Sequence, residues 1–112
     1  MNFENKKMQL CRLVQDSTSN DTEKKTDVME YHRINGIDFG FVECRDKREF
    51  YAIHLDSGFA AVTMESKGYG QKQGFIELYE KVKAIPEAQF KDAIPKMKKR
   101  FKDFGLTYPL NG

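Results

Sequence analysis

Residues 28–65 read VMEYHRINGIDFGFVECRDKREFYAIHLDSGFAAVTME, and this stretch decides the fold. Strand-forming residues fill it, and turn residues interrupt it at Asn35-Gly36, at residues 45–48 and at residues 56–58. Asn-Gly is the preferred pair for a tight hairpin turn because both residues tolerate positive φ. The spacing therefore predicts an antiparallel meander of four strands, at residues 28–34, 37–44, 49–55 and 59–65.

Side chains along a strand alternate between the two faces of a sheet, and we name the two predicted faces by their composition. The aliphatic face carries Met29, Tyr31, Val42, Cys44, Tyr51, Ile53, Leu55, Ala60, Val62 and Met64. Because it is nearly all apolar, we predict that it is the core face. The aromatic face carries Phe39, Phe41, Phe50, Phe59, Ala52 and Ala61, mixed with Glu30, His32, Glu43, His54, Thr63 and Glu65. A shift of one residue in the pairing of a strand would exchange its two faces.

Two helices are predicted after the meander. Residues 71–85 carry apolar side chains at helical spacing, and Pro86 follows them. Residues 90–104 carry a second apolar stripe, and Gly105 follows as a helix-ending residue. Pro95 lies inside the second stripe, where it removes a backbone donor. We therefore predict that the second helix either is kinked at Pro95 or contains Pro95 in its first turn.

The first 27 residues fit two kinds of structure. Residues 3–15 have apolar side chains at helical spacing, which favours a short helix, but Met8–Gln15 also alternates as an extra strand would. Residues 16–27 contain no apolar side chain, so we expect a flexible loop there. The chain is thus divided into an N-terminal segment with a flexible loop, residues 1–27, and a single α+β domain, residues 28–112. The expected fold is a four-stranded antiparallel β-meander with two C-terminal helices packed on one face, plus an N-terminal helix or extra strand.

The composition is typical of a soluble globular protein, with 32% charged and 39% hydrophobic residues. No apolar run approaches the roughly 20 residues that a membrane span needs, and the N-terminus lacks the apolar core of a secretory signal. We therefore expect a cytoplasmic protein with no membrane partner. In that reducing compartment Cys11 and Cys44 would be free thiols.

No catalytic, cofactor or metal motif stands out in the sequence. The glycines after the meander lack the spacing of a phosphate-binding loop, and there is no CxxC pair. The expected strand pairing aligns His32, Phe39 and His54, which separates the two imidazoles by about 9–10 Å, too far to share a metal. Thr63 is the hydroxyl nearest to His54 in this register, with no third orienting group. We therefore expect a protein that is not an enzyme, without a catalytic residue, cofactor or metal.

Charge is unevenly distributed, although the net charge is only +2. Residues 28–66 contain four basic and seven acidic side chains, whereas residues 67–112 contain ten basic and five acidic ones. A basic cluster lies opposite the apolar stripe of the second predicted helix, and it consists of Lys96, Lys98, Lys99, Arg100 and Lys102. Such a cluster is found in nucleic-acid-binding proteins, but an ordinary solvated helix face has the same pattern.

The aromatic face is the predicted binding surface, because four phenylalanines on a sheet face are too many to leave in water. The N-terminal segment, a partner protein, a second copy of the chain or stacked bases would each cover them. Glu30, Glu43 and Glu65 around the rings would repel phosphate, which argues against bases. We therefore expect a small non-catalytic protein-binding module that acts as a regulator or inhibitor of a larger protein, or that binds a second copy of itself. Nucleic-acid binding through the basic C-terminal helix is the alternative. The predicted binding residues are Phe39, Phe41, Phe50, Phe59, His54, Lys96, Lys99 and Arg100.

Overall fold

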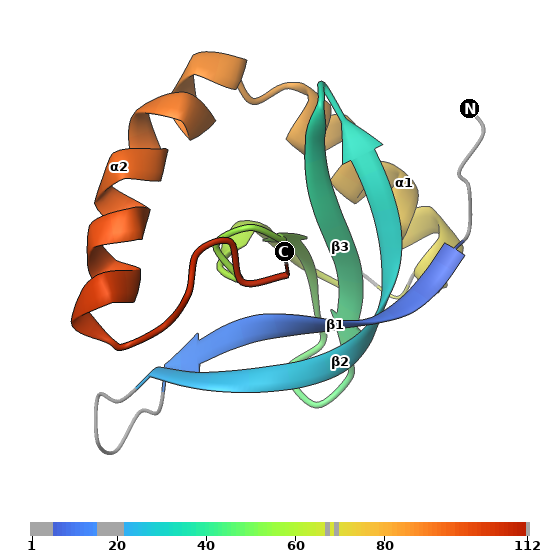
Figure 1. Ribbon diagram of the computed structural model, residues 1–112. Helices are drawn as coiled ribbons and strands as arrows, with labels where there is room; N and C mark the ends of the chain where they lie inside the picture. Colours follow the sequence, from blue (N-terminus) through green and yellow to red (C-terminus); the bar gives the residue numbers. More distant parts are fainter. Residues whose placement is uncertain (1–5, 16–21, 67, 69, 112) are drawn as a thin grey trace.

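A computed structural model describes residues 6–15, 22–66, 68 and 70–111. Its described residues form an α+β fold, in which five antiparallel strands make one sheet in chain order and two helices follow (Figure 1). The elements are β1 (Lys6–Gln15), β2 (Thr22–Ile34), β3 (Ile37–Cys44), β4 (Glu49–His54), β5 (Ala60–Glu65), α1 (Gln71–Lys83) and α2 (Glu87–Asp103). The predicted α+β class is confirmed, with five strands in the sheet rather than four. Neither of the two described helices is long and apolar enough to cross a membrane.

The predicted turns connect the strands from β2 to β5. Asn35 and Gly36 have φ values of 52° and 78°, as a hairpin turn with two left-handed residues requires. The pairing places His32 opposite Phe39, and Phe39 opposite His54, across β2, β3 and β4. The predicted alignment of these three rings is therefore confirmed.

The N-terminal segment contains a strand, not the helix predicted at residues 3–15. β1 pairs antiparallel with β2 along its whole length, which confirms the alternative of an extra strand at Met8–Gln15. Helical spacing was misleading here because a strand of mixed polarity obtains its backbone hydrogen bonds from its neighbour, whatever the spacing of its own apolar side chains.

The flexible loop predicted at residues 16–27 is wrong for residues 22–27, which belong to β2. Residues 16–21 lie outside the described residues. The polar stretch forms a strand because β1 supplies partners for its backbone, and because Arg12 and Asp27 form an ion pair between the two strands. Polar composition alone is therefore no evidence against a strand when a neighbouring strand is available.

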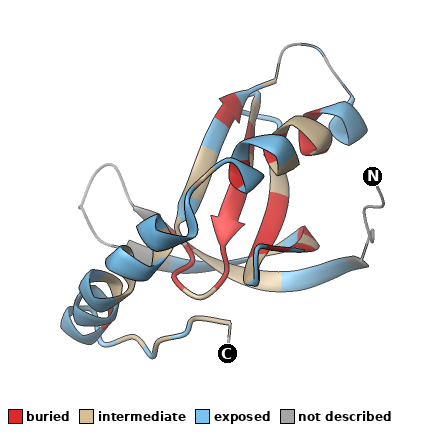
Figure 2. Cartoon of the chain, turned by 90° about the horizontal axis from the view of Figure 1, so that it is seen from above, coloured by how far each residue is buried: buried red, intermediate tan, exposed pale blue. Residues whose placement is uncertain are grey.

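The main core lies on the aromatic face, so the prediction that the aliphatic face is the core face is wrong. α1 packs across the aromatic face, and Phe39, Phe41 and Phe50 have at most 1% of their surface exposed. Phe75 of α1 meets the rings of Phe41 and Phe50 edge to face, at centroid distances of 5.7 and 6.0 Å. Figure 2 shows buried residues on the strands and on one side of α1. Both faces are rich in apolar residues, so composition could not identify the one that the helix covers.

A β-bulge reverses the predicted faces of β5 from Val62 onward, whereas Ala60 still pairs with Ile53 of the aliphatic face. Phe50 pairs with Met64 and Ala52 pairs with Val62, and the register shifts between Ala52 and Ile53. Because residues directly opposite one another share a face, Val62 and Met64 belong to the aromatic face rather than the aliphatic one. The displacement of one residue at the bulge is the slip that exchanges the faces of a strand.

Both the helices and the strands contribute deeply buried residues. Leu78, Val82, Phe101 and Ile53 each have at most 2% of their surface exposed, whereas Val62 is only partly buried on the edge strand. Cys11 and Cys44 are both free thiols, as predicted.

A smaller core lies on the aliphatic face. Its buried residues are Met29, Ile53 and Leu55, and Leu10 of β1 packs against them. Gly40 of β3 leaves room for this packing, because a Cβ there would lie 2.5 Å from the sulfur of Met29. The sheet is therefore packed on both faces, with the larger cluster on the side of α1.

One amide side chain joins three distant parts of the chain next to this smaller core. Asn111 accepts a hydrogen bond from the Cys11 N–H at 2.7 Å and donates to the carbonyls of Cys11 and Leu55 at 2.8 Å each. Nearby, the N–H of Leu13 donates to the carbonyl of Gly58 at 2.8 Å. These bonds fasten β1 and the C-terminal segment to the turn between β4 and β5.

α2 stands away from the sheet over most of its length (Figure 1). Phe101 is the one buried residue of α2, all of which the structure describes. The start of α2 is held by Phe90, whose ring meets those of Phe39 and His54 at centroid distances of 5.6 Å each. Pro95 lies in the interior of the helix, so the alternative with Pro95 in the first turn is wrong.

Gly74 allows α1 to lie close to the sheet, and its replacement tests that approach. A Cβ at Gly74 would lie 2.5–2.8 Å from three ring atoms of the buried Phe50. We expect Gly74→Ala to lower the free energy of unfolding by about 1 kcal/mol, because overpacking of about 1–3 kcal/mol outweighs the gain in helix propensity. Chemical denaturation measures this change. Gln73→Ala is the control, and Phe50→Leu should cost less in the Gly74→Ala background than in the original chain. A stabilised Gly74→Ala variant would contradict the close packing.

Asn111→Asp tests the amide bridge. A carboxylate still accepts from the Cys11 N–H but donates to neither carbonyl, so two acceptors lose their partner. We expect the free energy of unfolding to fall by about 1–3 kcal/mol, measured by denaturation above pH 6. Thr107→Ala, on an exposed residue of the same segment, should change stability by less than about 0.5 kcal/mol. Equal effects of the two substitutions would show that the bridge contributes nothing.

Candidate functional site

The predicted binding residues do not form one surface. Phe39, Phe41 and Phe50 are core residues, so the prediction that they form an exposed docking face is wrong. α1 covers them, rather than the N-terminal segment or a partner. His54 and Phe59 lie together at the end of the aromatic face that α1 leaves to α2. The remaining predicted residues are exposed on α2: Lys96, Lys99 and Arg100.

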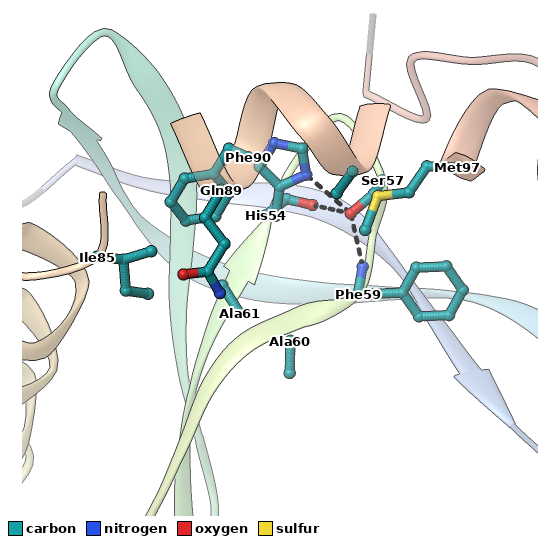
Figure 3. A pocket seen from close by; sticks show the side chains of 10 residues that line it. His54, Ser57, Phe59, Ala60, Ala61, Ile85, Gln89, Phe90 and Met97 are labelled. Carbon is teal, nitrogen blue, oxygen red and sulfur yellow. Dashed lines mark hydrogen bonds between the residues drawn. The ribbon is translucent and has the colours of Figure 1, made fainter. Parts of the chain in front are cut away.

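His54 and Phe59 line a groove between α2 and the start of β5, with a cavity of about 160 Å³ (Figure 3). The turn before β5 and the first residues of β5 form one wall. Ile85, which precedes α2, and residues of α2 form the other. The side chains that line the cavity are mostly apolar: Ala60, Ala61, Ile85, Phe90, Ala93 and Met97. Concave apolar sites with a few polar groups are the usual form of binding sites.

The floor of the groove is a His54–Ser57 pair (Figure 3). The Nδ1 of His54 lies 2.8 Å from the Ser57 Oγ, and that Oγ also lies 3.3 Å from the His54 carbonyl. The Phe59 N–H donates to the same Oγ at 3.3 Å. The single hydroxyl proton of Ser57 therefore goes to His54, through either its ring or its carbonyl. The ring of Phe90 stacks on the imidazole at an interplanar angle of 20°.

A serine hydrogen-bonded to a histidine is also the first requirement of nucleophilic catalysis. Ser57, however, has no exposed surface, and its hydroxyl is engaged by the ring and carbonyl of His54 and by the N–H of Phe59. These bonds are those of a serine that stabilises its own turn. The geometry of the pair is therefore better suited to shaping the floor of the groove than to attacking a bound group.

His54 is neutral at pH 7. Burial lowers the pKa of its imidazole below the usual value of 6.5, and the carboxylates of Asp56 and Asp38 oppose that change only in part. A neutral ring stacked on Phe90 keeps the floor of the groove without net charge. An apolar group is consequently the best match for the inner part of the cavity.

His32, the other histidine, does not belong to the groove. Its ring lies 4.3 Å from that of Phe41 and 6.1 Å from that of Tyr79, and its Nε2 is 3.5 Å from a Glu30 carboxylate oxygen. Burial lowers the pKa of His32, and the neighbouring Glu30 acts in the opposite direction. His32 and His54 are thus separated by the strand that carries Phe39. Among the described residues, no three histidine, cysteine, aspartate or glutamate side chains gather as metal ligands would.

One basic side chain of α2, that of Arg100, lies next to the groove. The guanidinium of Arg100 lies over the ring of Phe59, 6.0 Å from its centroid. Lys98 points elsewhere, because its ammonium lies 5.7 Å from the ring of Tyr108. None of the residues that line the cavity is acidic. The predicted basic cluster is therefore split, and Arg100 is the member next to the groove.

The sequence identified His54, Phe59 and Arg100 as candidate residues but not the groove that unites them. It missed Ser57, because the hydroxyl nearest to His54 in the predicted register was that of Thr63, across the sheet. The signal for Ser57 was local: a serine three residues after the histidine, inside a turn that ends in glycine. The alanines of the groove carry no sequence signal of their own, since their role is to leave space.

Comparison of the chain with protein-family models, with curated proteins and with solved structures finds no match.

His54→Asn tests the environment of the imidazole. Because the pKa of His54 is lowered by burial, the unfolded chain takes up a proton near pH 6.5 that the folded chain does not. The free energy of unfolding therefore falls as the pH decreases below about 6.5. Asparagine keeps an amide near the position of Nδ1 and does not titrate, so we expect a smaller decrease between pH 7.5 and 5.5 in denaturation experiments. His32 supplies the remaining slope, and an unchanged slope would contradict the burial of His54.

Proposed function

We propose that this chain is a small, non-catalytic protein-binding module, which regulates or inhibits a larger protein by holding a segment of that protein in the groove between α2 and β5. The observation that carries the proposal is an apolar cavity of about 160 Å³ at the margin of the sheet, next to an edge strand. Peptide-binding domains commonly hold their ligands in a groove beside a sheet edge, where pockets accept side chains and the backbone supplies hydrogen bonds.

The packing of α2 supports this proposal. A helix that packs fully against a core buries a continuous stripe of apolar side chains. In α2, all of which the structure describes, Phe101 is the one buried residue. Met97 of its apolar stripe and the nearby Ala93 are half-buried and line the groove instead. The half-covered stripe leaves apolar surface that a bound segment would remove from water.

Nucleic-acid binding is the alternative function. The exposed Lys96, Lys99 and Arg100 favour it, but Glu87, Asp92 and Asp103 lie on the same helix. Phosphate contacts would make binding fall steeply as salt rises, whereas a segment held in an apolar cavity would not. Salt dependence therefore distinguishes the two functions.

The proposal is tested with random linear peptides displayed on phage and selected on the immobilised protein. We expect selected peptides to lose at least about tenfold in affinity, roughly 1.4 kcal/mol, on Ala93→Trp, which fills the cavity. Ala88→Trp, on an exposed residue of α2 that does not line the cavity, should bind normally. Fluorescence anisotropy measures affinity, and thermal unfolding checks both variants.

Two results would contradict the proposal. One is a selection in which no peptide distinguishes Ala93→Trp from Ala88→Trp. The other is tight binding of a single-stranded oligonucleotide that falls steeply with salt and is lost in Lys99→Glu, which would favour the nucleic-acid alternative.

A further inference from the structure

We infer that the segment in the groove is an extended peptide that adds to β5 as a sixth strand, places one apolar side chain in the cavity and directs an acidic side chain to Arg100. This inference rests on the proposed function and adds the mode of binding and the chemistry of the ligand. Three features carry it: the backbone of β5, the size of the cavity and the charge of α2.

The outer edge of β5 has backbone groups available for a further strand. The N–H of Ser66 donates to the carbonyl of Arg48 at 2.7 Å, which makes these residues a hydrogen-bonded pair. Bonded and non-bonded pairs alternate along an antiparallel ladder, so Met64 bonds to β4, and Thr63 and Glu65 direct their N–H and C=O groups to the outside. No strand of the described residues pairs with this edge. An unpaired edge is a template for another strand.

The cavity has the size of one side chain. Its volume of about 160 Å³ is close to the roughly 150 Å³ of a cavity that accepts benzene. Ala61 and Ala93 leave the space, and Phe90 and Met97 supply apolar walls. A strand beside β5 points every second side chain to the face on which α2 lies, so one residue of the peptide can enter the cavity. A large aliphatic or aromatic side chain is the matching group.

The charge at the end of the cavity is positive. Ala93, Lys96 and Arg100 follow one another at spacings of three and four residues, which places them along one side of α2. Arg100 lies over Phe59, which itself lines the cavity. A carboxylate one or two residues from the apolar anchor of the peptide would meet this guanidinium.

A second copy of the chain is the other occupant that an open strand edge allows. Two copies joined through β5 by a two-fold axis would place both α2 helices on the same face of the joined sheet. The basic side chains of the two α2 helices would then approach each other, and like charges oppose association. Charge therefore favours an acidic partner segment over a second copy.

The charge contact is tested with the tightest selected peptide, synthesised with a fluorophore. We expect its sequence to carry an acidic residue near the apolar anchor. Replacing that acid with lysine should weaken binding by about fivefold, the effect of roughly 1 kcal/mol from an exposed ion pair. Arg100→Glu should weaken binding of the acidic peptide and restore binding of the lysine peptide. Lys102→Glu, which reverses an exposed charge beyond the residues that line the cavity, is the control. An unchanged preference for the acidic peptide in Arg100→Glu would overturn the assignment of Arg100.

Strand addition is tested on the unaltered protein by N-methylation of the peptide backbone, one residue at a time. In a paired strand every second N–H bonds to the neighbour, so we expect losses of about tenfold at alternate positions. Thr63→Pro removes an outward N–H of β5 without touching the ladder with β4 and should weaken binding to a similar degree. Thr63→Val, which keeps the N–H, should bind normally.

The outcomes separate this inference from the function on which it rests. Peptides that require an open cavity at Ala93 but tolerate N-methylation at every position would overturn strand addition and leave the proposed function in place. A selection without any peptide sensitive to Ala93→Trp would overturn both. A protein that sediments as a dimer, with Thr63→Pro making it monomeric, would show that a second copy occupies the edge and would also overturn the inference.

Discussion

The fold depends on how closely α1 approaches the ring of Phe50. With no side chain at Gly74, the helix lies low on the aromatic face, and the rings of β3 and β4 become the largest core of the molecule. Burial of large aromatic side chains is among the strongest contributions to folding. Because α1 occupies the centre of that face, α2 can reach only its margin. The groove beside β5 is thus a consequence of the position of the first helix.

Local signals predicted the turns well and the packing poorly. Asn35-Gly36 identified its hairpin because positive φ at both residues is a local requirement that few residue pairs satisfy. The sheet face that α1 covers was predicted wrongly. Both faces are apolar, and which of them becomes the main core depends on how well its side chains fit the helix. The bulge at Ala52 and Ile53 also shifts the pairing of β5 with β4 by one residue, and the composition of β5 does not predict this shift. β1 was ambiguous because its hydrogen bonds come from β2.

The candidate site shows the same division between single residues and their arrangement. Phe59 was identified as one of four phenylalanines on one predicted sheet face, and His54 as a histidine on the same face. Their neighbours in the groove are mainly alanines and a methionine of a helical stripe, which the sequence presents as ordinary core residues. The cavity exists because the side chains that line it are small and because α2 stands away from the sheet between its two ends. Phe90 and Phe101 hold the helix near those ends. The residue pattern of α2 does not show how far the helix lies from the sheet.

The bridge made by Asn111 has a consequence for the order of folding. The hairpins of β2, β3 and β4 close over short loops, whereas Asn111 and Cys11 are 100 residues apart along the chain. The entropy of closing a loop grows with its length, and contacts of large sequence separation form slowly. The meander and α1 are therefore expected to assemble before β1 and the C-terminal segment are fastened together. In the native state, local opening is expected to begin where the hydrogen bonds of Asn111 hold β1 to the C-terminal segment. Amide protons of β1 should therefore exchange with solvent earlier than those of β3 and β4.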